Sequence, residues 1–119
     1  MSISKLISKV IGEKAQWRQY KARAKQLPAS YRTALEALER YLMYAGGGDD
    51  GTKIFADLVD LFEQSAANRT PIRQVVGEDP VEFIELFVLN YPRGQWILRE
   101  RERLTHAIER AVEEEPSGA

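Results

Sequence analysis

The chain contains no cysteine, and this absence excludes several kinds of site. Without thiols there is no disulfide bond, no thiolate zinc site and no cysteine nucleophile. His106 is the only histidine, so clusters of histidine ligands are excluded too. It lies in a charged stretch of sequence, which favours a surface position. A serine nucleophile would have to use this same residue as its base. The sequence therefore predicts a protein that is not an enzyme, with no cofactor and no metal.

Long apolar runs are also missing. No stretch approaches the roughly 20 residues of a membrane span, and Lys5, Ser8 and Lys9 interrupt the first eleven residues, where a secretory segment would be apolar. We expect a cytoplasmic location and no transmembrane segment. At 119 residues, with 44% hydrophobic and 29% charged residues, the composition is that of a soluble protein. Residues 1–119 are expected to form a single helical domain, with a frayed tail over about 113–119.

Apolar residues recur at helical spacing along most of the chain, so the predicted fold class is all-α, a single compact domain of about six helices. Gly12 is expected to end or bend the first helix. The segment 81–91 is apolar around most of its circumference and is expected to be the central helix of the core. Six or seven helices are expected, depending on whether Gly12 ends or only bends the first. They cover residues 3–11, about 13–26, about 30–45, a segment through 66 that Asp49, Asp50 or Thr52 caps, a short segment ending at 77, 81–91 and about 95–114.

Capping residues mark several of these boundaries. Gly77 suits the left-handed position that closes a helix, Asp79 can cap the next one, and Pro80 fits its first turn. Ser30 and Thr70 are predicted to cap the helices that follow them. The order in which the helices pack does not follow from these signals.

Charge is distributed unevenly, and the basic part holds the best candidate binding surface. Residues 1–40 carry a net charge of +6, residues 41–95 carry −5, and residues 96–119 carry −2. Four cations fall within roughly 60° of one another along about 16 Å of helix, as phosphates or an acidic protein surface would require. Trp17 and Tyr20 lie close by and could stack on bases or belong to the core. This basic stripe consists of Lys14, Arg18, Lys21 and Lys25.

Other polar groups are interpreted as structural or solubilising. Asp57, Asp60 and Glu63 face away from the apolar side of their helix. The pair Glu82 and Glu85 lacks the histidine of a di-iron motif. Residues 46–53 match neither a phosphate-binding loop nor a calcium loop, because the order and spacing of their glycine, lysine and acidic residues are wrong. That segment is predicted to be a connector between helices.

Several phrases resemble a bacterial family, the domain-of-unknown-function family 1048, over about residues 7–110. The resemblance implies a compact all-helical domain whose helices form an orthogonal, left-handed superhelical array, and it implies no reaction. It also suggests PadR-like transcription regulators as partners, because such proteins tend to be encoded nearby. The matching phrases are Ile11-Gly12-Glu13-Lys14 with Trp17, Leu27-Pro28 with Tyr31, Tyr41-Leu42-Met43 before Gly47-Gly48-Asp49, Leu58 to Phe62, Val75 to Asp79 with Phe83, and Trp96.

The leading functional hypothesis is a non-enzymatic helical module that binds another protein, such as a PadR-like regulator, or binds itself. A nucleic-acid-binding domain that uses the basic stripe is the alternative. A third reading places the first helix on a membrane surface through the apolar residues of segment 3–10. The final helix carries an apolar seam that packs either within the monomer or against a second copy. This seam comprises Ile97, Leu104, Ile108 and Ala111.

Overall fold

The computed structural model describes residues 3–45 and 51–116, with side chains from residue 12 onward except at 51, 52 and 93. Within these ranges the regular structure consists of six α-helices, and no strand is present. The predicted all-α class is therefore confirmed. The helices are α1 (Ile3–Lys25), α2 (Ala29–Tyr44), α3 (Gly51–Ala67), α4 (Ile72–Val76), α5 (Pro80–Val88) and α6 (Pro92–Glu114).

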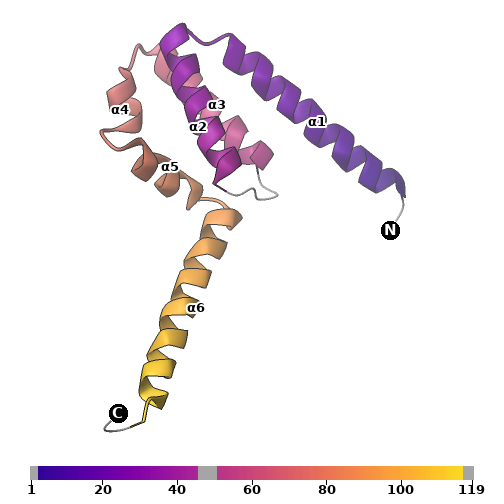
Figure 1. Cartoon of the computed structure of the whole chain (residues 1–119). Helices are drawn as coiled ribbons and strands as arrows, with labels where there is room; N and C mark the ends of the chain where they lie inside the picture. Colours follow the sequence, from indigo (N-terminus) through magenta and orange to yellow (C-terminus); the bar gives the residue numbers. More distant parts are fainter. Residues whose placement is uncertain (1–2, 46–50, 117–119) are drawn as a thin grey trace.

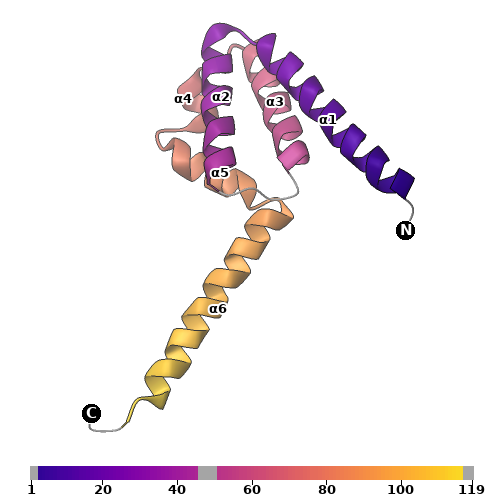
Figure 2. The same cartoon turned by 45° about the vertical axis from the view of Figure 1, so that its right-hand side comes forward.

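Five helices form the packed part of the molecule, and the sixth projects from it (Figure 1). Helix α3 packs against α1 and α2, while α4 packs against α2 and α5. Helix α6 packs on α5 and then runs away from the other helices, as both Figure 1 and Figure 2 show. The radius of gyration is 19.6 Å, against about 13 Å for a compact domain of this length. Both α6 and the N-terminal end of α1 extend away from the other helices in Figures 1 and 2, and the molecule is elongated.

Helix α3 is the centre of the hydrophobic core. Its apolar side is buried almost completely, and it lies between α1 and α2. The prediction that segment 81–91 forms the central helix is wrong. Only Ile84 and Val88 of α5 are fully buried, whereas Val81 and Leu86 are about half exposed. Helix α5 is short and lies at the edge of the packed part, so one of its apolar sides faces solvent. The buried residues of α3 are Ile54, Phe55, Leu58, Val59, Phe62 and Ser65.

The phrase around Gly77 has the predicted local structure. Gly77 ends α4 with φ +78°, a region that residues with a Cβ rarely adopt. The Asp79 carboxylate accepts hydrogen bonds from the backbone N–H groups of Val81 (3.1 Å) and Glu82 (3.2 Å). Pro80 begins α5, where its missing N–H costs nothing.

Other predicted boundaries differ from the structure. Helix α1 continues through Gly12, so the two expected helices are one. Pro28 rather than Ser30 precedes the first residue of α2, and Pro71 rather than Thr70 precedes α4; neither helix has a side-chain cap. The last helix, expected over 95–114, begins three residues earlier, with Pro92 in the first turn of α6. At α2, α4 and α6 a proline with its fixed φ lies at the start of the helix, and none of these helix starts has a side-chain cap.

Two further expectations concern the ends of the packed helices. The apolar residues of segment 3–10 belong to α1, but their side chains lie outside the described residues, as do residues 46–50 of the predicted connector. Among the described helices, none combines the length and apolar character needed to cross a membrane.

Candidate interaction surfaces

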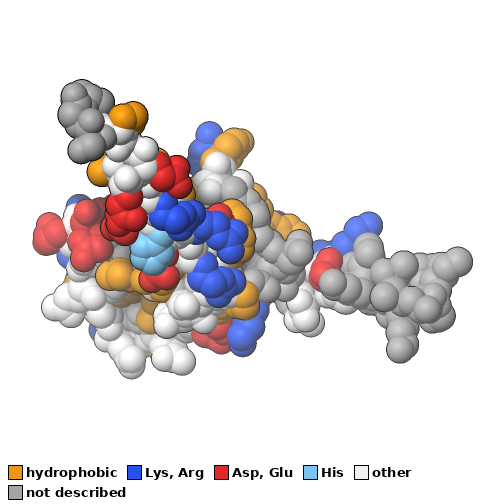
Figure 3. Space-filling view, turned by 90° about the horizontal axis from the view of Figure 1, so that it is seen from below, with side chains coloured by type: hydrophobic (Ala, Val, Ile, Leu, Met, Phe, Trp, Pro, Cys, Tyr) orange, Lys and Arg blue, Asp and Glu red, His pale blue; other side chains and the backbone are white. Residues whose placement is uncertain are grey.

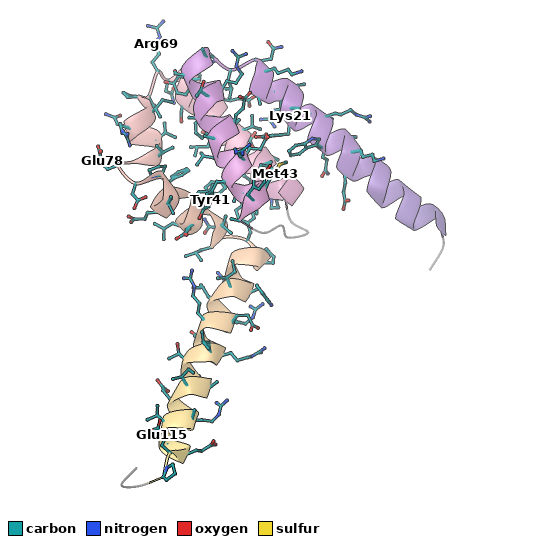
Figure 4. The ribbon with its side chains drawn as sticks, in the orientation of Figure 1. Lys21, Tyr41, Met43, Arg69, Glu78 and Glu115 are labelled. Atoms are coloured by element: carbon teal, nitrogen blue, oxygen red, sulfur yellow. The ribbon has the colours of Figure 1, made fainter. Side chains whose placement is uncertain are left out.

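The basic stripe lies on α1, but only part of it faces solvent freely. Lys14, Arg18 and Lys25 are exposed. The Lys21 ammonium lies 3.0 Å from the Glu39 carboxylate of α2 and 5.5 Å from the centre of the Trp17 ring. Figure 4 shows Lys21 on α1 beside α2. The buried carboxylate neutralises this cation, whereas Lys14, Arg18 and Lys25 form no ion pair with the residues whose side chains are described.

The aromatic residues next to the stripe belong to the core. Tyr20 is 3% exposed, and the ring centres of Trp17 and Tyr20 lie 5.3 and 5.2 Å from that of Phe55 on α3. Trp17 is partly buried against the same cluster. These packed rings hold α1 on α3 and are not free to stack on nucleic-acid bases.

The carboxylates of α3 form hydrogen bonds with side chains from other parts of the fold. Arg23 of α1 donates to Asp60 and, through its Nε at 3.1 Å, to Glu63. The hydrogen bonds to Glu63 and Asp60 raise the pKa of Arg23. Tyr91 follows α5 in the chain, and its hydroxyl group donates a hydrogen bond of 2.5 Å to the Asp57 carboxylate. The interpretation of these three carboxylates as purely solubilising charges is therefore wrong, because each contacts a residue from another part of the fold.

A cleft that the sequence does not indicate lies where α2, α5 and α6 meet. Its volume is about 350 Å³. Tyr41 donates a hydrogen bond of 3.3 Å to Glu85 at its edge, and Figure 4 shows Tyr41 of α2 near α5. Its walls combine apolar groups with acidic side chains of α5 and with Arg101 of α6. Its lining includes Tyr41, Leu42, Glu82, Glu85, Ile97 and Arg101. These residues come from three separate segments, so no local spacing could have revealed the cleft.

Helix α6 exposes an apolar surface along its projecting part. Beyond residue 100, Leu104 is 64% exposed, Ile108 57% and Val112 58%. The repeat of four residues advances each side chain by about 40°, so the three lie on one side of the helix. Ala111 is also exposed, whereas Ile97 lies at the cleft and is half-buried. The predicted seam therefore does not pack within the chain beyond Ile97. We call Leu104, Ile108, Ala111 and Val112 the α6 apolar face.

No group of three or more metal-ligating side chains occurs among residues whose side chains are described. His106 is exposed on α6, as expected for a surface histidine. Figure 3 looks at the molecule from the side on which α6 projects and shows acidic, basic and hydrophobic side chains close together around the histidine.

Comparison with known proteins places the chain in a family without assigning an activity. No curated protein matches it significantly. The model of the family described as protein of unknown function, DUF1048, matches residues 8–109. That match covers most of the chain, including all of α2 to α5 and most of α1 and α6. The chain therefore belongs to the DUF1048 family.

Proposed function

We propose that this protein is a non-enzymatic helical module that binds another protein through the α6 apolar face, as a regulatory accessory in the cytoplasm. The observation that carries the proposal is the exposure of Leu104, Ile108 and Val112 on a helix that projects from the packed part. Burying three such side chains contributes about 1.5 to 3 kcal/mol each. A partner that covers this face therefore gains affinity that the isolated chain leaves unused.

The charged groups support a binding role rather than a reaction. Arg23, Lys21 and Tyr91 use their polar atoms to hold helices together. The acidic residues at the α2–α5–α6 cleft lie beside Arg101 and have no histidine near them in the sequence. A PadR-like transcription regulator is the first partner to test. That suggestion comes from the family resemblance alone.

The test uses the full chain as bait in a bacterial lysate treated with nuclease, with captured proteins identified by mass spectrometry. We expect the wild-type chain to retain a specific protein and Leu104→Glu to lose at least nine-tenths of it. His106→Glu is the matched control, since it adds the same charge to the same helix on the side away from the apolar face. Equal capture by the wild-type chain and Leu104→Glu would contradict the proposal.

Nucleic-acid binding by the basic stripe is the second candidate, and the exposure of Lys14, Arg18 and Lys25 favours it. Three phosphate contacts give a slope of about −3 in a plot of log affinity against log salt concentration. Fluorescence anisotropy with duplex DNA should show this slope for the wild-type chain and no binding for the triple glutamate variant of these residues. The variant leaves the Lys21–Glu39 pair intact, so the fold is preserved. Binding that survives the change, or that is insensitive to salt, would contradict this candidate.

A further inference from the structure

The apolar and charged residues of α6 together have a symmetry that indicates its partner. Leu104, Ile108 and Val112 are spaced evenly, so the exposed stripe is centred on Ile108. It covers about 12 Å of helix. A second helix that packs against this apolar face contacts Leu104 on one side of Ile108 and Val112 on the other, and these two side chains are similar in size.

Charge differs between the two ends of the same helix. Residues 99–103 hold three arginines and two glutamates, whereas residues 109–115 hold four glutamates and one arginine. Two copies aligned in parallel would bring acidic end to acidic end and basic end to basic end. In the antiparallel orientation each basic end meets an acidic end, which is favourable and selects the orientation.

We propose that α6 pairs with α6 of a second copy of this chain in an antiparallel, two-fold symmetric contact whose axis passes at Ile108. This inference rests on the proposed function, since it takes the α6 apolar face as the binding surface and names its occupant. In this register Leu104 lies opposite Val112 of the second copy, and Ile108 lies opposite Ile108. The contact is self-complementary, as two-fold symmetry requires.

The same register aligns the charges at the edges of the contact. Arg101 of one copy lies opposite Glu115 of the other, and each lies within about 20° of Ile108 around its helix. Residues 101–115 of the two helices overlap along about 21 Å.

The shape of the molecule leaves room for this contact. Helix α6 carries Glu115 at an end that lies away from the other five helices in Figure 4. The C-terminal end of the second copy would reach Arg101, which lines the α2–α5–α6 cleft. In an antiparallel pair the two packed parts therefore lie at opposite ends and do not collide.

Analytical ultracentrifugation of the full chain tests the pairing. We expect the wild-type chain to reach twice its monomer mass of 13.6 kDa as concentration rises, and Ile108→Glu to remain monomeric over the same range. His106→Glu should dimerise like the wild-type chain, because residue 106 points about 160° away from residue 108 around the helix. Far-UV circular dichroism verifies that both variants keep their helices. A wild-type chain that stays monomeric at several hundred micromolar would overturn the inference.

The absence of cysteine makes the orientation testable by disulfide trapping. In the antiparallel register Leu104→Cys and Val112→Cys should cross-link with each other when mixed, and neither should cross-link alone. Their Cα atoms must approach within about 7 Å for a disulfide to form. In a parallel pair each variant would instead cross-link with itself, and that result would contradict the proposal.

These measurements separate the two proposals. A chain that stays monomeric, yet retains a different protein through Leu104 in the capture experiment, overturns self-pairing and supports the proposed function. A chain that dimerises by another surface, with Ile108→Glu still dimeric, overturns the self-pairing of α6. Loss of capture together with a wild-type monomer contradicts both proposals.

Discussion

At the scale of single residues, two tyrosines in the packed part differ in what their hydroxyl groups contact. The Tyr91 hydroxyl donates to Asp57. The Tyr20 hydroxyl is buried with no hydrogen-bond partner among the described residues. Burial raises the pKa of both groups, helped by Glu39 at Tyr20 and by Asp57 at Tyr91. The same kind of residue should therefore respond differently to removal of its hydroxyl.

We predict that Tyr91→Phe lowers the free energy of unfolding by about 1 to 2 kcal/mol, because the bond to an ionised carboxylate is lost. Tyr20→Phe should leave it unchanged or raise it slightly, since an unpartnered buried hydroxyl is removed. Urea denaturation at pH 7 measures both changes. A loss above about 1 kcal/mol in Tyr20→Phe would contradict the prediction and show that this hydroxyl is hydrogen-bonded in solution.

The raised pKa values of Tyr20 and Tyr91 determine how the stability of the fold changes with pH. A raised pKa in the fold means that the folded state keeps its proton longer than the unfolded chain does. The contribution to stability is thus complete below the unfolded tyrosine pKa of about 10 and is lost as pH rises above it. The wild-type chain should lose stability above pH 10 more steeply than the double variant Tyr20→Phe, Tyr91→Phe. Thermal melts between pH 8 and 11 compare the two slopes; equal slopes would contradict the prediction.

Glycines at two positions make a second residue-scale contrast. A Cβ on Gly94 would lie 2.3 Å from the Val88 carbonyl oxygen and 2.7 Å from the Leu89 Cα, so α6 approaches α5 there with no room for a side chain. A Cβ on Gly12, inside α1, would meet nothing within 4 Å. We predict that Gly94→Ala destabilises the fold by about 1 to 3 kcal/mol. Gly12→Ala should stabilise it by about 0.5 to 1 kcal/mol.

Urea denaturation measures both glycine variants under one condition. Gly12→Ala serves as the control, because it makes the same chemical change where space is available. If Gly94→Ala were as stable as the wild-type chain, the close approach of α5 and α6 would be wrong.

At the scale of elements, α5 depends on a single side-chain cap. The Asp79 carboxylate accepts two backbone N–H groups of a helix of nine residues. We predict that Asp79→Ala costs about 1 kcal/mol. Glu78→Ala, one residue earlier and also exposed, should cost less than about 0.5 kcal/mol because its carboxylate caps no helix in the structure. Thermal denaturation at low salt compares them, and similar losses in both variants would argue against the cap.

The helices could be predicted from the sequence to different degrees for physical reasons. Local capping around Gly77 and Asp79 was predictable because every interaction falls within five residues. The continuity of α1 through Gly12 was not, since glycine weakens a helix by only about 1 kcal/mol, which packing of the rest of the helix outweighs. The central position of α3 depends on which faces meet, and that information is not contained in the spacing of one segment.

Features of the candidate surfaces were also predictable only where the residues concerned lie close together in the sequence. The basic stripe of α1 was predictable, because residues 14–25 lie on one helix. Neutralisation of Lys21 by Glu39 was not predictable, since 18 residues separate them. Arg23, which binds two carboxylates of α3, lies outside the stripe and gave no local signal. The seam of α6 was visible from its spacing, whereas its exposure became clear only from the fold.

At the scale of the whole molecule, α6 beyond the cleft and the packed part are separate in their energetics. Tyr91 is the last residue of the buried hydrophobic core. Within α6, half-buried side chains occur up to Glu100, and beyond it only Ala107 is half-buried among the described residues. A chain that ends after Glu100 keeps the Gly94 contact and Ile97 at the cleft. It loses the α6 apolar face, the charges beside it and Arg101 at the cleft.

We therefore predict that this truncated chain unfolds cooperatively, with a melting temperature within about 5 °C of the full chain at low concentration, since a 1 kcal/mol change shifts it by roughly that amount. If α6 pairs with itself, raising the concentration should stabilise the full chain and leave the truncated chain unchanged, because only a folded dimer gains from mass action. Differential scanning calorimetry at two concentrations separates the stability of the packed part from the stability that dimerisation adds. A truncated chain that fails to unfold cooperatively would instead show that the projecting helix is needed for the core itself.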